Sequence, residues 1–439
     1  MSGTHDLVIR GATVVTPEVT IAGGAVAVSG GKISYVGVAA GAPPAAAAVE
    51  LPDGYLLPGF VDLHCHGGAG FDVTVGRYQN ETRSFSGAAE DFRAGARAVP
   101  RAHLAHGTTG LLLSTFAAEE QVLLLALAAA GQAVGDPETG ARVLGVNLEG
   151  NYLKAGEFAG AQNPAHFRHP SAEDFDRLNA AALGRIKVVD VAADHGYAAV
   201  DLVRHLVKCE VVASCGHTGA NYAEMVACID AGVTLAVHFS NGPSATSFKP
   251  PGMATEAMLG DPRVTLELIA DGYHVNPKYL LSFLAAKKFR AVLVTDAMAP
   301  VAAPEITRFT LAGKTGELAP DGGVFRLSGS ATTLFGSVLT MDRAVANVVG
   351  WLVEGLPGMY QNAPVIDPKP LKEEALVLVS RLASGYPAEV LGLRDQFGAI
   401  EMNLLADLVY LDEDLSARRV WVGGKQPAAT AEAKPAAGE

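Results

Sequence analysis

The sequence is poor in cysteine, and it has neither a long apolar run nor a block of basic residues. Four cysteines in 439 residues, with no CxxC pair, exclude a disulfide scaffold and favour a reducing compartment. The longest apolar runs fall short of the roughly 18 residues that a membrane span needs. The formal net charge is -13, and Lys and Arg do not cluster, so neither nucleic acid nor a membrane is an expected partner.

Apolar residues, by contrast, are abundant. They make up 49% of the chain, while charged residues make up 18%, which is enough for a large core and excludes global disorder. The first residues, MSGTHDLVIRGATVV, contain no basic segment leading into an apolar stretch, so no signal peptide is expected. These features predict a cytoplasmic protein.

The two ends of the chain share one pattern. Residues 1–57 and the segment LADLVYLDEDLSARRVWVGGK, at the end of the predicted C-terminal part (residues 381–424), both consist of short β-type runs separated by turns, many of which contain glycine. We therefore predict a small β-sandwich domain built from both termini. Residues 425–439 have low complexity and are predicted to be disordered.

The middle of the chain, residues 58–380, alternates short β-rich runs with helical segments. Eight such runs are present, the first in YLLPGFVDLHCH and the last in AVLVTDA. This alternation is typical of an α/β protein with a (β/α)8 TIM barrel. A doubly wound open sheet is the alternative, but the glycine-rich turn that usually follows its first strand is missing.

Histidines and carboxylates stand where the predicted strands end. In a barrel these ends surround the active site, so we expect the side chains to converge there. The residues, from strands one, three, five, six, seven and eight, are His64, His66, Glu149, His217, His238, His274 and Asp296.

The spacing of the first pair predicts metal binding. Alternate residues of a strand face the same side, so His64 and His66 point together into the barrel mouth and Cys65 points away. Imidazole and carboxylate suit Zn²⁺, Fe²⁺, Mn²⁺ or Co²⁺. We interpret Cys65 and Cys215 as small core residues. The alternative for Glu149 and Asp296 is capping of the segment that follows, but both come directly after buried-type runs.

Taken in order, several motifs resemble the N-acetylglucosamine-6-phosphate deacetylase family of the amidohydrolase superfamily. They are LPGFVDLHCHGG, LEG, GAQNP, GHT, AVHFSN, LIADGYHV, LVTDAMA, GSVLTMDRAV and ADLVYLDEDL. The shorter pieces VDLHCH and VTDA alone indicate the superfamily, while LIADGYHV, LVTDAMA and GSVLTM indicate the deacetylase branch. Their order and distances agree with the family over nearly the whole chain.

The resemblance implies metal-dependent hydrolysis of the acetamide of N-acetylglucosamine 6-phosphate, giving glucosamine 6-phosphate and acetate in amino-sugar catabolism. It implies one ion held by Glu149, His217 and His238, and a second held by His64 and His66 with Glu149 bridging and Asp296 nearby. Zinc is the first choice, and iron, manganese and cobalt are alternatives. Asp296 would accept a proton from water and pass it to the departing amine.

Substrate contacts and a homodimer are also implied by the resemblance. Lys249 stands where the family carries an arginine that reaches the phosphate from the neighbouring subunit, and lysine binds phosphate without the bidentate fork. The implied contacts to sugar and phosphate are Ala161, Gln162, Asn241, Gly242, Lys249, His274, Leu334, Phe335 and Gly336.

The chain departs from the family pattern near the sugar. Asn147 and Asn151 replace the usual residues around LEG, VHFSNGPS replaces a THLFNAM-like stretch, and residues 71–87 form a longer loop than expected. N-acetylgalactosamine 6-phosphate therefore stays open as the substrate. Another amidohydrolase activity, such as N-acyl-amino-acid deacylation, is a further alternative; a cyclic amidase would carry a lysine after strand four, where KVVDVAADHG has none. A non-enzymatic sugar-phosphate binder is the last alternative.

Overall fold

Eight parallel strands form the central sheet of the computed structural model, and they follow one another in sequence order. The structure describes residues 5–136, 139–241, 246–247, 249–311, 313–330, 333–356, 366–367 and 369–427, so most of the tail predicted to be disordered lies outside it. The strands are β8 (Phe60–Cys65), β13 (Thr108–Thr115), β14 (Arg142–Tyr152), β15 (Ile186–Val191), β16 (Val212–Cys215), β17 (Val233–Ala236), β18 (Thr265–Ile269) and β19 (Ala291–Val294).

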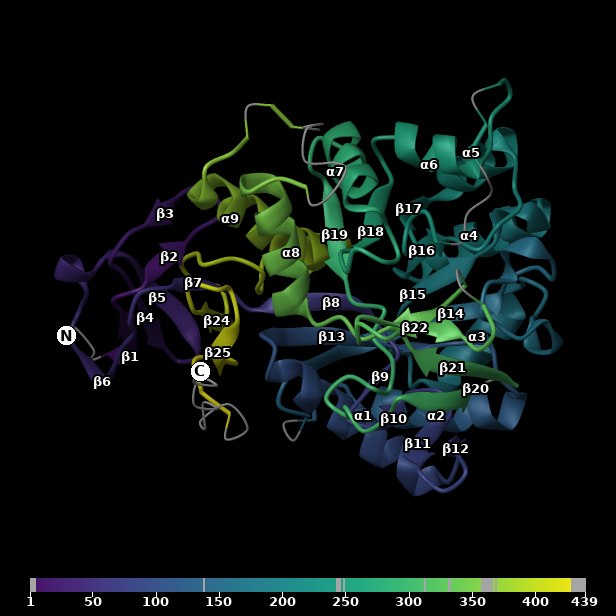
Figure 1. The fold of residues 1–439 in the computed structure, drawn as a ribbon, viewed down its shortest axis with the longest axis horizontal. Coiled ribbons are helices and arrows are strands. Elements are labelled where there is room, and N and C mark those ends of the chain that lie inside the picture. Colours follow the sequence, from purple (N-terminus) through teal and green to yellow (C-terminus); the bar gives the residue numbers. More distant parts are fainter. Residues whose placement is uncertain are drawn as a thin grey trace.

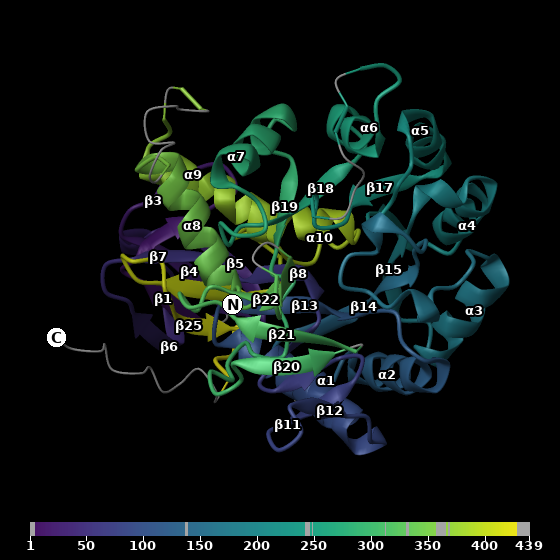
Figure 2. The ribbon, with the colours of Figure 1, turned by 45° about the vertical axis from the view of Figure 1, so that its right-hand side comes forward.

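The sheet closes on itself at the ends of its first and last strands. Asp296, after β19, donates its N–H to the His64 carbonyl at 2.8 Å, and His66 donates its N–H to the Ala297 carbonyl at 2.9 Å. A parallel bridge between Cys65 and Ala297 completes the closure. The sheet and its ring of helices (Figure 2) agree with the predicted (β/α)8 barrel.

Helices follow the strands and cover the outside of the sheet. They are α1 (Ala89–Leu104), α2 (Glu120–Ala133), α3 (Ala172–Ala181), α4 (Tyr197–Lys208), α5 (Tyr222–Ala231), α6 (Ala254–Gly260), α7 (Pro277–Ala286) and α8 (Met341–Val353). Local sequence sets their ends: at α5, Asn221 and Glu224 form a capping box, and Gly232 ends the helix with φ of 130°. Because both faces of the sheet are covered, its strands are apolar and buried, as in the fully buried β13.

Two small antiparallel sheets stand at the barrel mouth (Figure 1). The first contains β9 (Gly67–Gly68), β10 (Phe71–Asp72), β11 (Gly76–Gln79) and β12 (Ser84–Ser86), so the long loop noted at residues 71–87 folds into strands. The second, the flap sheet, contains β20 (Arg308–Leu311), β21 (Lys314–Leu318), β22 (Val324–Leu327) and β23 (Leu334–Ser337). An apolar cluster that includes Phe116, Met298 and Phe309 holds the flap sheet against the barrel.

Both chain ends contribute to the strands on the left of Figure 1. One sheet has the order β5-β4-β1-β6, and the other, β25-β24-β7-β2-β3, joins the two ends directly. Their strands are β1 (His5–Arg10), β2 (Thr13–Val15), β3 (Thr20–Ile21), β4 (Gly24–Ser29), β5 (Lys32–Val38), β6 (Ala45–Glu50), β7 (Tyr55–Pro58), β24 (Leu408–Leu411) and β25 (Ala417–Trp421). Val26, Leu408 and Trp421 lie in one apolar cluster drawn from both sheets. The domain boundaries inferred from the sequence stay predictions.

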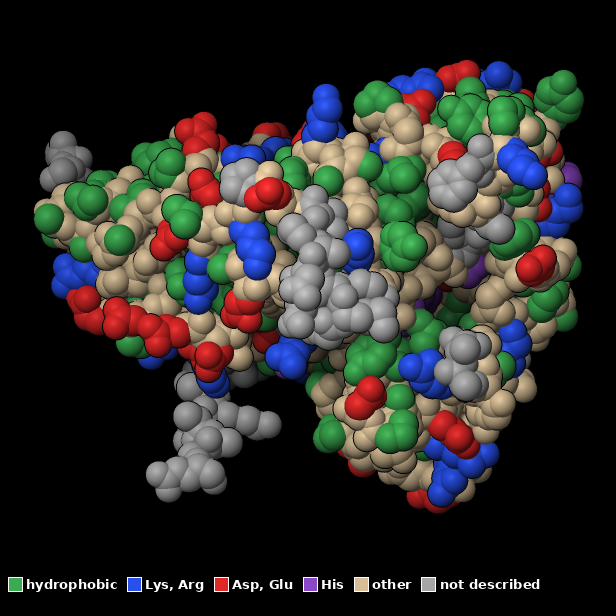
Figure 3. All heavy atoms as spheres, turned by 45° about the horizontal axis from the view of Figure 1, so that its top comes forward, with side chains coloured by type: hydrophobic (Ala, Val, Ile, Leu, Met, Phe, Trp, Pro, Cys, Tyr) green, Lys and Arg blue, Asp and Glu red, His purple; other side chains and the backbone are tan. Residues whose placement is uncertain are grey.

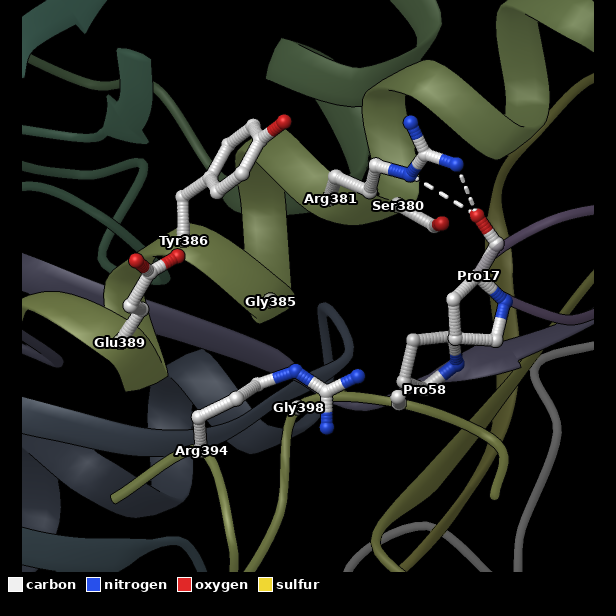
Figure 4. A pocket seen from close by; sticks show the side chains of 10 residues that line it. Pro17, Pro58, Ser380, Arg381, Gly385, Tyr386, Glu389, Arg394 and Gly398 are labelled. Atoms are coloured by element: carbon white, nitrogen blue, oxygen red, sulfur yellow. Dashed lines mark hydrogen bonds between the residues drawn. The ribbon is translucent and has the colours of Figure 1, made fainter. Parts of the chain in front are cut away.

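The segment α9 (Lys372–Ser380), a π-helical turn (Arg381–Gly385) and α10 (Tyr386–Val390) connects the barrel to these sheets. Arg381 donates to the carbonyl of Pro17 beside a cavity of about 200 Å³ (Figure 4). The described lining of this cavity contains one carboxylate, Glu389, and no histidine, so it does not resemble a catalytic site. Throughout the described ranges, the helices are too short or too polar to cross a membrane.

Candidate active site

All the strand-end residues singled out in the sequence lie at the same end of the barrel. Glu149 is within β14 and His64 is within β8, while the others follow their strands directly or after a short loop. The structure brings six of them together at the floor of one cavity: His64, His66, Glu149, His217, His238 and Asp296. In Figure 3 histidine side chains are visible inside a hollow of this face.

Three of these residues form a compact first half-site. Glu149 Oε1 lies 3.4 Å from His217 Nε2 and 3.3 Å from His238 Nε2. The two Nε2 atoms are 3.0 Å apart. Two imidazole nitrogens and one carboxylate oxygen are a usual donor set for a catalytic zinc, with a further position left for water or substrate.

The HxH pair forms the second half-site and shares Glu149 with the first. The Nε2 atoms of His64 and His66 are 3.1 Å apart, and His66 Nε2 lies 3.8 Å from Glu149 Oε2. Asp296 Oδ1 lies 3.4 Å from His66 Nε2 and 3.7 Å from His64 Nε2. Oε1 of Glu149 thus faces His217 and His238 while Oε2 faces His66, an arrangement that can hold one or two divalent ions.

Hydrogen bonds to the other ring nitrogen test whether these histidines fit a metal. His217 Nδ1 lies 2.9 Å from the carbonyl of Phe158, so Nδ1 carries the proton and Nε2 keeps a free lone pair. His64 Nδ1 likewise lies 3.0 Å from Glu267 Oε2. One histidine of each half-site is therefore held with its Nε2 available to a divalent ion.

At the first half-site, burial and the neighbouring side chains shift the pKa values of Glu149 and His217 in opposite directions. Burial raises the pKa of Glu149, but hydrogen bonds from His217 and His238 and the nearby His66 hold that pKa well below its ordinary range. Burial lowers the pKa of His217, and the bond to Glu149 more than reverses this. The site thus favours positive charge beside Glu149, and a metal ion supplies that charge in place of protons.

The sequence reasoning missed Glu267, a buried carboxylate in β18. Its Oε2 accepts from His64 Nδ1 and, at 3.0 Å, from the His238 backbone N–H, so it holds one histidine of each half-site. Burial lowers the pKa of His64, but the charge of Glu267 and the bond to it raise that pKa to about 10. A carboxylate inside the apolar run VTLELIAD was the available signal, since a buried charge needs a partner.

Three of the strand-end residues have left-handed backbone conformations. The φ angles are 45° at His217, 23° at His238 and 51° at Asp296. Such conformations cost on the order of 1–3 kcal/mol each in non-glycine residues and concentrate at functional sites. Here they turn the chain sharply at the strand end, which directs each side chain across the mouth.

A cavity of about 680 Å³ opens above the half-sites. Most of the residues assigned to the sugar by resemblance line it: Ala161, Gln162, Asn241, His274, Leu334, Phe335 and Gly336. Gly242 lies outside the described residues. Lys249 is exposed and is not among the described lining residues of its own chain's cavity. Gln162 has a contact that the sequence did not indicate, because its amide Nε2 donates to Glu149 Oε2 at 2.6 Å.

The flap sheet adds cavity residues that the sequence reasoning did not name. Arg326, on β22, lines the cavity together with Tyr273, whose hydroxyl donates to Asp321 at 3.0 Å. Gly323 lets the Tyr273 ring approach, since a Cβ there would lie 2.3 Å from its hydroxyl oxygen. A turn sequence between β21 and β22, APDGG, was the available signal for this hairpin.

The departures at residues 147 and 151 lie beneath the site. Asn147 donates to the Leu63 carbonyl and to Ser114, and Asn151 donates to the Glu149 carbonyl. Both are fully buried: Asn147 links β14 to β8 and β13, Asn151 bonds the backbone of its own strand, and neither is among the described residues that line the cavity. Cys65 and Cys215 are fully buried, as predicted for core residues.

A barrel with two histidine–carboxylate half-sites at its mouth has the architecture of a metal-dependent hydrolase. The amidohydrolase family model matches residues 55–428. The chain therefore belongs to the amidohydrolase family.

Three similar proteins are deacetylases of phosphorylated amino sugars. N-acetylgalactosamine-6-phosphate deacetylase of Escherichia coli O157:H7 is 32% identical over 390 residues, which cover 89% of this chain and 92% of the relative. N-acetylglucosamine-6-phosphate deacetylase of Bacillus subtilis is 29% identical over 418 residues, covering 93% and 94%. A solved mutant structure of the Mycobacterium smegmatis N-acetyl-D-glucosamine-6-phosphate deacetylase, in complex with that sugar phosphate, has a TM-score of 0.80 at 30% identity and covers 97% of this chain and 99% of that chain.

Proposed function

We propose that this protein hydrolyses the acetamide of N-acetylglucosamine 6-phosphate, giving glucosamine 6-phosphate and acetate. The observation that carries the proposal is the pair of half-sites sharing Glu149 beneath the cavity, with Asp296 at its edge. The deacetylases similar to this chain over most of its length support the amino-sugar phosphate as the substrate.

We propose Zn²⁺ as the ion, with Fe²⁺, Mn²⁺ and Co²⁺ as alternatives, because the donors are imidazole and carboxylate. Glu149, His217 and His238 would hold the first ion, and His64 and His66 would contribute to a second. A bound divalent ion lowers the pKa of water and polarises a carbonyl.

Asp296 is the proton carrier in this proposal. Its side chain is 15% exposed, so it reaches the cavity, and Oδ1 lies 3.4 Å from His66 Nε2 at the metal site. The backbone N–H bond from Asp296 to the His64 carbonyl fixes its position. A carboxylate held there can take a proton from water and deliver it to the amine that leaves.

The remaining cavity residues would bind the sugar and its phosphate. We propose contacts from Ala161, Asn241, Gly242, His274, Leu334, Phe335 and Gly336. Gln162 lies at the boundary between sugar and metal, since its amide touches Glu149. We propose that Arg326 contacts the phosphate from the same chain. Lys249 would contact it from the partner subunit of a homodimer.

N-acetylgalactosamine 6-phosphate is the second candidate substrate. It is favoured by the 32% identical relative, whose name specifies that sugar. The two sugars differ only in the orientation of one hydroxyl, and the departure VHFSNGPS includes Asn241, which lines the cavity. An N-acyl-amino-acid substrate would not need the cationic groups assigned to phosphate.

Acetate release is the decisive assay. The protein, loaded in turn with Zn²⁺, Fe²⁺, Mn²⁺ and Co²⁺, is given N-acetylglucosamine and N-acetylgalactosamine, each with and without the 6-phosphate. We expect the highest kcat/KM for N-acetylglucosamine 6-phosphate. A higher kcat/KM for N-acetylgalactosamine 6-phosphate would make that sugar the substrate. Acetate release from acetylated amino acids alone would instead assign the protein to that substrate class.

We further propose that the two terminal sheets form one β-sandwich, which the shared apolar cluster supports. A cytoplasmic location follows from the proposed substrate and stays a prediction.

A further inference from the structure

The side chain of Gln162 bonds the carboxylate that both half-sites share. Its Nε2 donates to Glu149 Oε2 at 2.6 Å, and its Oε1 accepts from the Ala117 backbone N–H at 3.1 Å. We propose that Gln162 is a positioning residue that makes the half-sites unequal, so that the chain binds one divalent ion tightly and a second one weakly. The proposal rests on the proposed function only insofar as the site holds divalent ions.

The two oxygens of Glu149 differ in how well they are placed for an ion. Donor atoms bound at about 2.1 Å to one tetrahedral ion lie about 3.4 Å apart. Oε1 meets this separation, at 3.4 Å from His217 and 3.3 Å from His238. Oε2 lies 3.8 Å from His66, which is too wide. Oε1 is therefore placed to share an ion with both of its histidines once their Nε2 atoms, 3.0 Å apart, separate slightly, while Oε2 must move toward His66 before the second half-site can use it.

Gln162 opposes that movement, because it already holds Oε2. A 2.6 Å hydrogen bond to a carboxylate is a strong one, and an ion between Oε2 and His66 would have to draw the oxygen away from its present position. The amide also occupies one of the lone pairs of Oε2 and reduces the negative charge available to an ion.

The orientation of this amide is determined by its two partners. Its oxygen faces the N–H of Ala117, and its NH₂ faces a carboxylate. The flipped orientation would set the amide oxygen against Glu149 and the NH₂ against an N–H, and both contacts would be repulsive.

The backbone around Gln162 is built to bring the side chain there. Its N–H donates to the Ala159 carbonyl at 3.1 Å. Gly150, with φ of 85°, lies directly beneath the amide, and a Cβ at this position would come within 2.6 Å of Gln162 Oε1. The contact with Glu149 is therefore supported by two loops and a glycine.

Gln162→Met is the variant that tests the role, since it removes the amide and keeps the length of the side chain. Asn163→Ala is the matched control in the same loop, because the Asn163 side chain accepts from the Ala165 N–H. Each full-length protein is stripped with a chelator and titrated with Zn²⁺ in competition with a chromophoric chelator. Bound zinc is counted by elemental analysis, and Mn²⁺ loading is followed by electron paramagnetic resonance for the signal of paired ions.

We expect the ratio of the second to the first dissociation constant to fall at least about tenfold in Gln162→Met, the size usual for groups that support metal ligands. The signal of paired Mn²⁺ ions should appear at a lower Mn²⁺ concentration in this variant than in the parent or in Asn163→Ala. An unchanged or increased ratio overturns the role of Gln162. A parent protein that binds no divalent ion overturns this role and the proposed function together, whereas one that binds ions as expected but releases no acetate overturns only the function.

Discussion

At the scale of single residues, neighbours decide which atom of each site residue faces the cavity. The Phe158 carbonyl fixes the proton of His217 on Nδ1, and Glu267 does the same for His64. Neither partner is adjacent to its histidine in the sequence. The residue types and the HxH spacing therefore predicted a metal site, while the protonation of its ligands depends on contacts between distant strands.

Replacing Asp296 with Asn tests the proton carrier. The amide cannot accept the proton, so we expect kcat to fall on the order of 10³-fold. Metal content should stay close to that of the parent, since Glu149, His217 and His238 remain. Acetate release and elemental analysis on the same sample measure both quantities. Hydrolysis at the parental rate would show that another group carries the proton.

A pH effect on stability is expected from His103. This residue is fully buried in α1, and its Nε2 lies 2.9 Å from the Gly67 carbonyl. Burial lowers its pKa to about 4, below the ordinary value of 6.5. Between these values the unfolded chain binds a proton that the folded chain excludes, so stability decreases as pH falls from 6.5 toward 4. At pH 5 the loss amounts to about 2 kcal/mol.

Denaturant unfolding of the parent and of His103→Gln at pH 7.5 and pH 5.0 measures this effect. The substitution lowers stability at pH 7.5, but the further loss at pH 5.0 should be about 2 kcal/mol smaller than in the parent. Both proteins are stripped of metal first, so that loss of ions in acid does not contribute. Equal losses in the two proteins would mean that His103 does not titrate in this range.

At the scale of elements, the loop after β14 must pass very close to the first half-site. Gly160 has φ of 60°, and a Cβ on it would lie 2.7 Å from His217 Cε1. Gly160→Ala should therefore displace the imidazole and weaken the binding of the first ion about tenfold or more. Zinc titration of the stripped protein measures the change.

Gly196→Ala is the control for the backbone effect. Gly196 has a similar φ of 62°, but a Cβ there meets nothing within 4 Å. The Gly196→Ala substitution should therefore lower the free energy of unfolding by about 1 kcal/mol and leave zinc affinity unchanged. If the two variants lose equal zinc affinity, backbone strain and not the contact with His217 is responsible.

Helices and strands with a strong pattern of apolar residues in the sequence were the ones that could be predicted. Strands such as β13 and β19 are continuous apolar runs, and all eight barrel strands were predicted from the sequence. The flap strands β20 to β23 were not, because they are short and only partly buried. Their stability comes from packing around Phe309, which is a tertiary contact.

At the scale of the whole molecule, Lys249 provides the test of the proposed dimer. It is exposed and is not among the described residues that line its own chain's cavity, so we propose that it reaches phosphate in a partner's cavity. Lys249→Ala should raise KM for the 6-phosphorylated sugar about tenfold or more, because a charged hydrogen bond contributes about 1.5–3 kcal/mol, and should leave KM for the unphosphorylated sugar unchanged.

Mixed dimers make this test specific to the partner subunit. A subunit with Asp296→Asn cannot turn over but supplies Lys249, and a subunit with Lys249→Ala keeps its own Asp296. Dimers assembled from the two variants should recover the parental KM with about half the parental kcat. A KM that stays raised in the mixture would place the function of Lys249 within its own chain.

The sequence by itself determined the barrel, the strand-end histidines and carboxylates, and the family, because strand alternation and short motifs are local patterns. It did not reveal Glu267 behind His64, the bond from Gln162 to Glu149 or the flap residue Arg326. Those depend on where side chains from separate strands and loops meet. Only the closed barrel sets these distances, and through them how each oxygen of Glu149 is placed to serve an ion.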